Sequence, residues 1–218
     1  MGCGKSSVGR KLSQLLCCPF MDLDPVIEER TGRSIPDIFA NEGEAAFRQM
    51  EMETLKNILE EVERQSAPLA PSHSRAAGPS PYAGVRECQF RTSASQPIST
   101  QIVLSLGGGT VMTQECAELV REKTTCIYLR ASVDTLTSRL ASEAEGRPLL
   151  NPAHNPGSTD SNNSLNEPAT DLRTRIESLM SRRASTYEAT AHIILDTDSL
   201  SVDQIAQTIT ESCLSYEI

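Results

Sequence analysis

The sequence lacks several features that would assign it at once to a large class of proteins. It has no surplus of basic residues, because 20 Lys and Arg stand against 29 Asp and Glu, for a formal net charge of −9. No apolar run approaches the roughly 18 residues that a membrane-spanning helix needs. No basic segment followed by an apolar one opens the chain, so we expect no secretory signal. A general nucleic-acid binder, which needs excess Lys and Arg, is disfavoured, although one locally basic phosphate pocket is not.

Paired cysteine motifs are also absent. The cysteines are odd in number and contain no C-x-x-C pair: Cys3, Cys17, Cys18, Cys88, Cys116, Cys126 and Cys213. We interpret them as reduced thiols, several of them buried, in a cytoplasmic protein. A chain of 218 residues can build one good core but hardly two. We therefore expect a single domain spanning 1–218.

Hydrophobic periodicity predicts alternating helices and strands. Residues 5–16 place apolar side chains at helical spacing, and helical patterns continue to about residue 63, with Gly32 and Pro36 as punctuation. Four short apolar runs, at 19–24, 102–106, 125–129 and 192–196, read as strands separated by helix-length segments. Buried strands that alternate with helices predict an α/β fold, a parallel sheet sandwiched by helices.

Two stretches break this pattern. Residues 64–100 are rich in Ser, Pro and Ala, and residues 151–170 are rich in Asn, Pro, Ser and Thr. Neither can bury enough apolar surface to offset the entropy of ordering. We predict a disordered insertion at 64–100 and a long surface loop within a lid region at about 140–172.

A glycine-rich segment precedes the first predicted helix. Gly2-Cys3-Gly4-Lys5-Ser6-Ser7 supplies the last three positions of the phosphate-binding pattern G-x-x-x-x-G-K-[ST], and the first glycine would fall before Met1. Glycines let backbone N–H groups face a phosphate, lysine reaches the terminal phosphates and serine can ligate Mg²⁺. Taken alone, the segment fits a chance Gly-rich helix start equally well. It also fits the N-myristoylation pattern, with Cys3 open to palmitate, which would indicate a lipid-anchored protein.

Acidic and basic side chains recur at spacings that suit phosphoryl transfer. Asp22 and Asp24 end the strand at 19–24, two residues apart and so on one face, where one can address a metal and the other a substrate hydroxyl. Arg48 and Glu51 lie three residues apart in a predicted helix, so that Glu51 can orient the arginine. Each pair also has an ordinary interpretation, a helix cap for the aspartates and a surface ion pair for Arg48.

Further along, three consecutive glycines follow a predicted strand. Gly107, Gly108 and Gly109 stand at its carboxyl end, the edge at which open α/β sheets bind ligands. Arg147 lies in the predicted lid, and Arg182 and Arg183 lie in a later helix. Arginines from separate segments suit a phosphoryl group in transfer together with a substrate carboxylate. A plain turn and solvated arginines are the alternative interpretations.

In this order, the motifs resemble those of the shikimate kinase family, a branch of the P-loop kinases related to nucleoside monophosphate kinases. The resemblance covers most of the chain outside the two insertions. It rests on G-C-G-K-S at 2–6, D-L-D at 22–24, E-E-R-T-G-R-S-I-P-D-I-F at 28–39, E-G-E at 42–44, F-R-Q-M-E at 47–51, S-L-G-G-G at 105–109, R-P-L-L at 147–150 and S-R-R-A-S-T-Y at 181–187.

The resemblance implies transfer of phosphate from ATP to the 3-hydroxyl of shikimate, in the biosynthesis of chorismate and aromatic amino acids, with Mg²⁺ as cofactor. It implies that Lys5 contacts the ATP phosphates, that Ser6 and Asp22 hold the metal, and that Asp24 binds the substrate hydroxyl and acts as base. The carboxylate would be clamped by Arg48 and Arg183, and the ring lined by Gly108 and Gly109. The remaining nucleotide contacts would come from Gly2, Cys3, Gly4, Ser7, Arg139 and the lid residue Arg147, which would close over the transferring phosphoryl group.

The sequence departs from the family at its beginning, where the first strand and the first P-loop glycine are missing. That strand is central in the family fold, so we expect the chain as written to be unstable or nearly inactive and a short added segment to restore it. The alternatives are a non-catalytic member of the family and a lipid-anchored signalling protein. As partners we expect ATP and shikimate, no nucleic acid and no membrane, and we expect a monomer.

Overall fold

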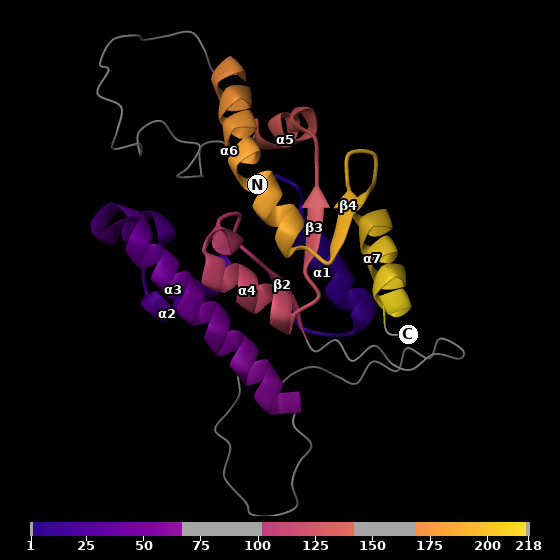
Figure 1. Ribbon diagram of the computed structural model, residues 1–218, viewed down its shortest axis with the longest axis horizontal. Coiled ribbons are helices and arrows are strands. Elements are labelled where there is room, and N and C mark those ends of the chain that lie inside the picture. Colours follow the sequence, from indigo (N-terminus) through magenta and orange to yellow (C-terminus); the bar gives the residue numbers. More distant parts are fainter. Residues whose placement is uncertain (1, 67–101, 142–168, 217–218) are drawn as a thin grey trace, which may run out of the picture. The chain divides into compact units, whose positions relative to one another are not determined.

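The computed structural model describes residues 2–66, 102–141 and 169–216. Helices and strands alternate along these residues, as Figure 1 shows. The chain forms two compact units. Unit 1 contains residues 1–5 and 108–200, and unit 2 contains residues 6–107 and 201–218. The predicted insertion and lid lie largely outside the described residues.

Unit 2 contains one parallel pair of strands. Strand β1 (Phe20–Asp22) pairs with β2 (Val103–Ser105), with Phe20 opposite Val103 and Asp22 opposite Ser105. Helix α1 (Lys5–Leu16), whose residues from Ser6 onward belong to this unit, buries Val8 and Leu12 at the predicted i, i+4 spacing. An ion pair of 2.5 Å between Lys11 and Asp203 links α1 to α7 (Val202–Tyr216).

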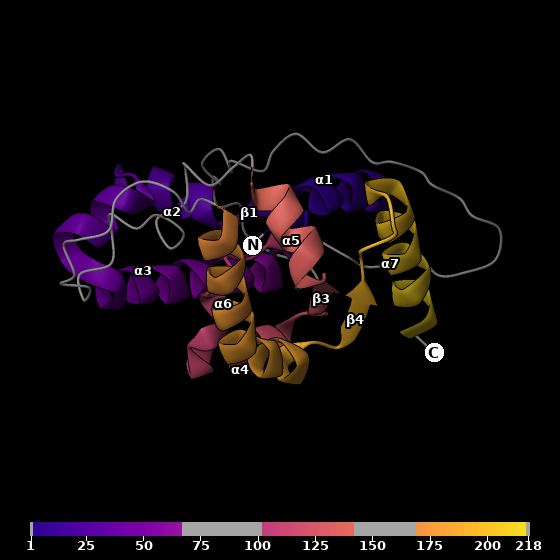
Figure 2. The same ribbon diagram turned by 90° about the horizontal axis from the view of Figure 1, so that it is seen from above.

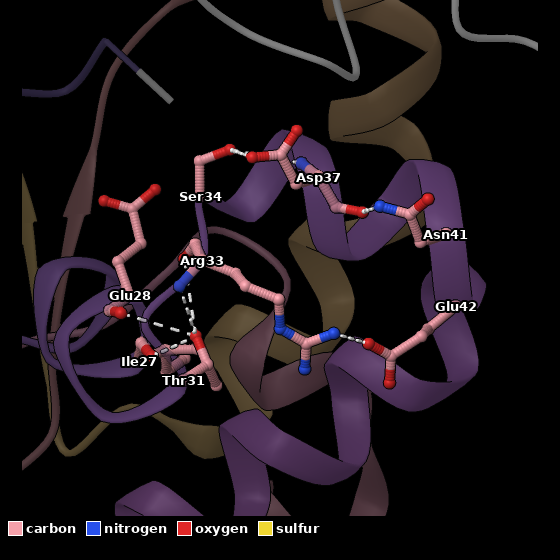
Figure 3. Close-up of polar contacts among 8 residues, drawn as sticks. All are labelled: Ile27, Glu28, Thr31, Arg33, Ser34, Asp37, Asn41 and Glu42. Atoms are coloured by element: carbon pink, nitrogen blue, oxygen red, sulfur yellow. Dashed lines mark hydrogen bonds and ion pairs between the residues drawn. The ribbon is translucent and has the colours of Figure 1, made fainter.

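The connection between α2 (Leu23–Thr31) and α3 (Ile35–Ser66) is held by polar contacts, drawn in Figure 3. Gly32 ends α2 in the left-handed conformation (φ 65°, ψ 19°), which glycine adopts without strain. Ser34 then caps α3, because its hydroxyl accepts the N–H of Asp37 at 3.2 Å. Figure 3 also shows the guanidinium of Arg33 reaching Glu42. These contacts fix the turn that the sequence predicts at Gly32.

Helix α3 is interrupted at Gly43, whose backbone (φ 83°, ψ 176°) is not helical. This conformation is open essentially to glycine alone. The helical segment after the kink buries Phe47, Leu55 and Ile58, and the ring of Phe47 contacts that of Phe39 with centroids 4.8 Å apart. The kink therefore separates two helical segments, and the contact between Phe39 and Phe47 joins them across it.

Unit 1 contains the second parallel pair. Strand β3 (Ile127–Arg130) pairs with β4 (Ile193–Asp196), with Ile127 opposite Ile193, and the two lie side by side in Figure 2. The short helix η1 (Thr110–Met112) leads into α4 (Gln114–Lys123), and α5 (Val133–Leu140) packs against α6 (Ala169–Thr190). Leu136, Leu140 and Ile176 form part of its core.

The structure confirms the predicted helix at 5–16 and the parallel pairing of strands, and it corrects two points. The strand predicted at 19–24 ends at Asp22, because the chain turns helical at Leu23. Residues 64–66 continue helix α3 instead of opening the insertion. The described strands form two parallel pairs, one in each unit. No helix within the described residues has the length and apolar character to cross a membrane.

Candidate active site

The glycines of the N-terminal loop have backbone conformations that other residues rarely adopt. Gly2 has a φ of 63° and Gly4 a φ of 81°. A Cβ on Gly2 would lie 2.8 Å from Leu140, so packing also excludes a side chain there. The loop ends where Lys5 begins the 12-residue helix α1. Inward-facing backbone N–H groups directly before a helix N-terminus form a phosphate-binding arrangement.

Directly after the loop, Ser6 donates its hydroxyl proton to the Asp22 carboxylate at 2.6 Å. Asp22 is the last residue of β1 and has an extended backbone. The hydroxyl keeps its lone pairs while it donates, so the pair offers neighbouring oxygen ligands of the kind that Mg²⁺ prefers. No group of three or more His, Cys, Asp or Glu among the described residues is placed to hold a metal. Two neighbouring oxygen donors suit Mg²⁺, which usually keeps several waters and is bound together with substrate phosphates.

Asp24 does not share a strand face with Asp22, contrary to the prediction. The backbone becomes helical at Leu23, whose side chain is fully buried, and Asp24 falls in the first turn of α2. An acidic residue there faces the positive end of the helix dipole. Asp22 occupies the N-cap position of α2, but its side chain makes no capping hydrogen bond. The Asp24 side chain is half-buried. It stands at the start of α2, two residues after Asp22 in the sequence.

Arg48 is fixed by two carboxylates of α3. Its Nη1 lies 2.6 Å from Glu51 Oε2 and its Nη2 lies 3.1 Å from Glu44 Oε1. The Arg48 side chain is 17% exposed and that of Glu51 only 1%, whereas Glu44 is 59% exposed. Burial lowers the pKa of Arg48, but the charges and hydrogen bonds of Glu51 and Glu44 outweigh it, so the net shift is upward. The guanidinium therefore stays charged in one orientation, as the i, i+3 spacing predicts.

In unit 1, helix α6 holds the backbone of the glycine segment. Arg183 Nη1 donates to the carbonyl oxygen of Gly108 at 3.1 Å, and the Tyr187 hydroxyl donates to the same oxygen. Gly109 is buried and directly precedes η1. The structure thus brings Arg183 and Gly108 together across 75 residues of sequence. Tyr187 was missed from the sequence, although its i+4 spacing from Arg183 places both on one helix face.

The remaining predicted residues have less definite surroundings. Arg139, in the last turn of α5, donates from Nη2 to the backbone oxygen of Thr197 at 3.3 Å. Cys3 is buried, and Ser7 is exposed in the first turn of α1. Arg182 is exposed and donates to the Ser178 hydroxyl within α6. Arg147 lies outside the described residues.

The predicted site residues divide between the two units. Unit 1 holds Gly2, Lys5, Gly108, Gly109, Arg139 and Arg183, whereas unit 2 holds Ser6, Asp22, Asp24 and Arg48. Within the units, the structure joins Ser6 to Asp22, Arg48 to Glu51 and Arg183 to Gly108. Each joined pair contains an oxygen or a guanidinium suited to phosphate, metal or carboxylate chemistry.

Comparison with solved structures defines the class of fold. The chain resembles a shikimate kinase from Acinetobacter baumannii, solved in complex with shikimate, with a TM-score of 0.69 and 24% identity over 100% of this chain and 90% of that one. It resembles the enzyme from Bacteroides thetaiotaomicron with a TM-score of 0.67 and 22% identity, over 100% and 94% of the two chains. The fold is therefore that of the P-loop kinases.

Sequence comparison identifies the family. The family model described as shikimate kinase matches residues 1–65 and 85–214. The shikimate kinase of Thermus thermophilus is 32% identical over 97% of this chain and 84% of its own length. That of Salinibacter ruber is 32% identical over 91% and 74% of the two chains. The chain belongs to the shikimate kinase family.

Proposed function

We propose that this chain is an enzyme that transfers the γ-phosphoryl group of ATP to the 3-hydroxyl of shikimate, a step in the synthesis of chorismate and aromatic amino acids. The observation that carries the proposal is the 2.6 Å hydrogen bond from the Ser6 hydroxyl to the Asp22 carboxylate. Ser6 directly follows the phosphate loop in the sequence. It joins the helix that begins at the loop to the end of a β-strand. Family membership supports shikimate as the phosphate acceptor.

ATP is held by the N-terminal loop and its helix. Backbone N–H groups of Gly2, Cys3 and Gly4 surround the phosphates, and Ser7 extends the contact into the first turn of α1. The ammonium group of Lys5 neutralises the terminal phosphates. Ser6 and Asp22 would hold Mg²⁺, Ser6 directly and Asp22 through water, and the ion would neutralise charge on the ATP phosphates. Arg139 flanks the adenine.

Shikimate is held by charges that complement its carboxylate and by groups that address its ring. The guanidinium groups of Arg48 and Arg183 bind the carboxylate, for which the planar arginine fork is suited. Gly108 and Gly109 line the ring with bare backbone. Asp24 accepts a hydrogen bond from the 3-hydroxyl, at the start of α2.

The chemistry needs positioning more than covalent participation. The 3-hydroxyl oxygen attacks the γ-phosphorus, the bond from that phosphorus to the bridging oxygen of ADP breaks, and the hydroxyl proton passes to Asp24. Lys5 and Arg147 stabilise the charge of the phosphoryl group during transfer. The enzyme acts as a monomer in the cytoplasm.

A coupled assay of ADP release, with and without shikimate, tests the proposal. We expect turnover that depends on shikimate, ATP and Mg²⁺ together. Arg183→Ala should lower kcat/KM for shikimate by about 30-fold or more while the KM for ATP changes little, because losing one partner of a bound carboxylate costs roughly 2–5 kcal/mol. Arg182→Ala is the matched control, because this exposed neighbour in α6 should leave both constants unchanged. The proposal would be refuted if neither the chain as written nor the chain with a short N-terminal segment added shows shikimate-dependent turnover.

A further inference from the structure

Two side chains of helix α6 converge on one backbone oxygen. The hydroxyl of Tyr187 and Nη1 of Arg183 both donate to the carbonyl oxygen of Gly108. Both lone-pair positions of a carbonyl oxygen can be used in this way. The two donors are four residues apart, hence on the same face of α6 and one turn apart. A glycine carbonyl held by two long-range donors is fixed much more firmly than a glycine segment by itself would be.

Fixing this oxygen also fixes the next amide. The peptide bond between Gly108 and Gly109 is planar, so its carbonyl and the N–H of Gly109 point in opposite directions. Because the oxygen faces Tyr187 and Arg183, the Gly109 N–H faces away from α6. Without the hydrogen bonds from Arg183 and Tyr187, glycine's broad φ/ψ range would let this peptide plane rotate. The two hydrogen bonds to Gly108 therefore determine the direction in which the Gly109 N–H points.

The Tyr187 ring is itself held in place. It contacts the Tyr128 ring of β3, with ring centroids 5.2 Å apart at an interplanar angle of 51°. The Tyr187 side chain is partly buried. The contact between the two rings, one from β3 and one from α6, therefore holds the Tyr187 hydroxyl in position against Gly108. A flexible side chain would hold it less firmly.

We infer that Tyr187 is a positioning residue for shikimate binding: through the Gly108 carbonyl, it orients the Gly109 N–H toward the substrate. The inference rests on the proposed function and extends it to a residue without a role in the chemistry itself. Arg183 has two roles, because one of its five N–H groups binds the Gly108 carbonyl while the others remain for the substrate carboxylate. Tyr187 only binds the Gly108 carbonyl.

The test compares Tyr187→Phe with Tyr128→Phe in the full chain. Each variant removes one hydroxyl from the same ring pair and keeps the ring. The Tyr128 hydroxyl is buried and finds no hydrogen-bond partner among the described residues, so its loss should leave kinetics unchanged and stability equal or slightly higher. Tyr187→Phe should raise the KM for shikimate about 3- to 10-fold, the effect of one lost hydrogen bond. Its kcat and its KM for ATP should stay within about twofold of those of the unmodified chain.

Thermal melts and equilibrium binding of shikimate complete the test. We expect Tyr187→Phe to melt cooperatively, at most about 4 °C below the unmodified chain, and to bind shikimate more weakly in proportion to its KM. An unchanged shikimate KM would overturn the inference. An equal rise in the KM for ATP or a failure to fold would overturn it too, because the hydroxyl would then serve the fold. If neither the chain as written nor the chain with the added segment uses shikimate, the proposed function fails first, so the two failures are distinguishable.

Discussion

The buried ion pair in helix α3 makes a strong prediction about stability. Arg48 and Glu51 are 2.6 Å apart, with 17% and 1% of their side chains exposed. Arg48→Met removes the cation and leaves the nearly inaccessible carboxylate of Glu51 without it. Removing one partner of a buried pair costs about 3–5 kcal/mol. Because Arg48 keeps some exposure, we expect the lower end, about 3 kcal/mol, or a fall in Tm of roughly 6–12 °C for a domain of this size.

Two further variants separate burial from charge. Glu44 also pairs with Arg48, but it is 59% exposed. Glu44→Gln should therefore cost no more than about 0.5 kcal/mol. Replacing both buried partners, in Arg48→Met with Glu51→Leu, should recover most of the loss, because no charge is then left desolvated. The comparison of single and double variants gives the coupling between the partners.

Urea denaturation followed by far-ultraviolet circular dichroism measures these free energies of unfolding. A loss of less than about 1 kcal/mol for Arg48→Met would refute the reasoning, because such a loss is typical of an exposed pair. A double variant no more stable than Arg48→Met would refute it as well. The stability measurement is independent of catalysis, so it tests the buried pair even if Arg48 has no substrate contact.

Two other predictions concern backbone conformation and pH. Gly32 has a left-handed backbone that asparagine also adopts, so Gly32→Asn should lower the free energy of unfolding by less than about 1 kcal/mol. The Gly43 conformation is open essentially to glycine alone, so Gly43→Asn should cost roughly 1–3 kcal/mol in the same urea assay. Equal losses for the two variants would contradict this. The hydrogen bond from Arg130 lowers the pKa of Asp196. The ionised Asp196 therefore stabilises the fold at pH values above the ordinary pKa of aspartate, and this stabilisation is lost as the pH falls through the lowered pKa. Asp196→Asn should therefore lose less stability than the unmodified chain between about pH 5 and pH 3. An unchanged slope of stability against pH for Asp196→Asn would refute this.

Features set by neighbouring residues could be predicted from the sequence. The helix at 5–16 follows from the spacing of Val8 and Leu12, and the stop at Gly32 follows from the need for a left-handed residue. The Arg48–Glu51 contact depends only on one helix and a separation of three residues. Such interactions are settled as soon as the local backbone is helical, whatever the rest of the chain does.

Features set by distant residues were predicted less well. The turn from strand to helix comes at Leu23, because burying this residue outweighs the extended pattern of residues 19–24, and Asp24 moves into a helix as a result. The contact of Tyr187 with Gly108 spans 79 residues. No local pattern specifies it, because the tyrosine reads equally well as an ordinary residue of an amphipathic helix.

The same distinction explains how the candidate site is built. Ser6 meets Asp22 only because α1 runs from the loop and the chain returns in β1, and Arg183 meets Gly108 only because α6 packs against the segment that contains η1. In each case one partner comes from a helix and the other from the segment where a strand ends or has just ended. Helices deliver the long, charged or hydroxyl-bearing side chains, whereas strand ends deliver carboxylates and bare backbone. The motifs can be listed from the sequence because each lies on one element, but the pairs that could perform the chemistry exist only after the elements have packed.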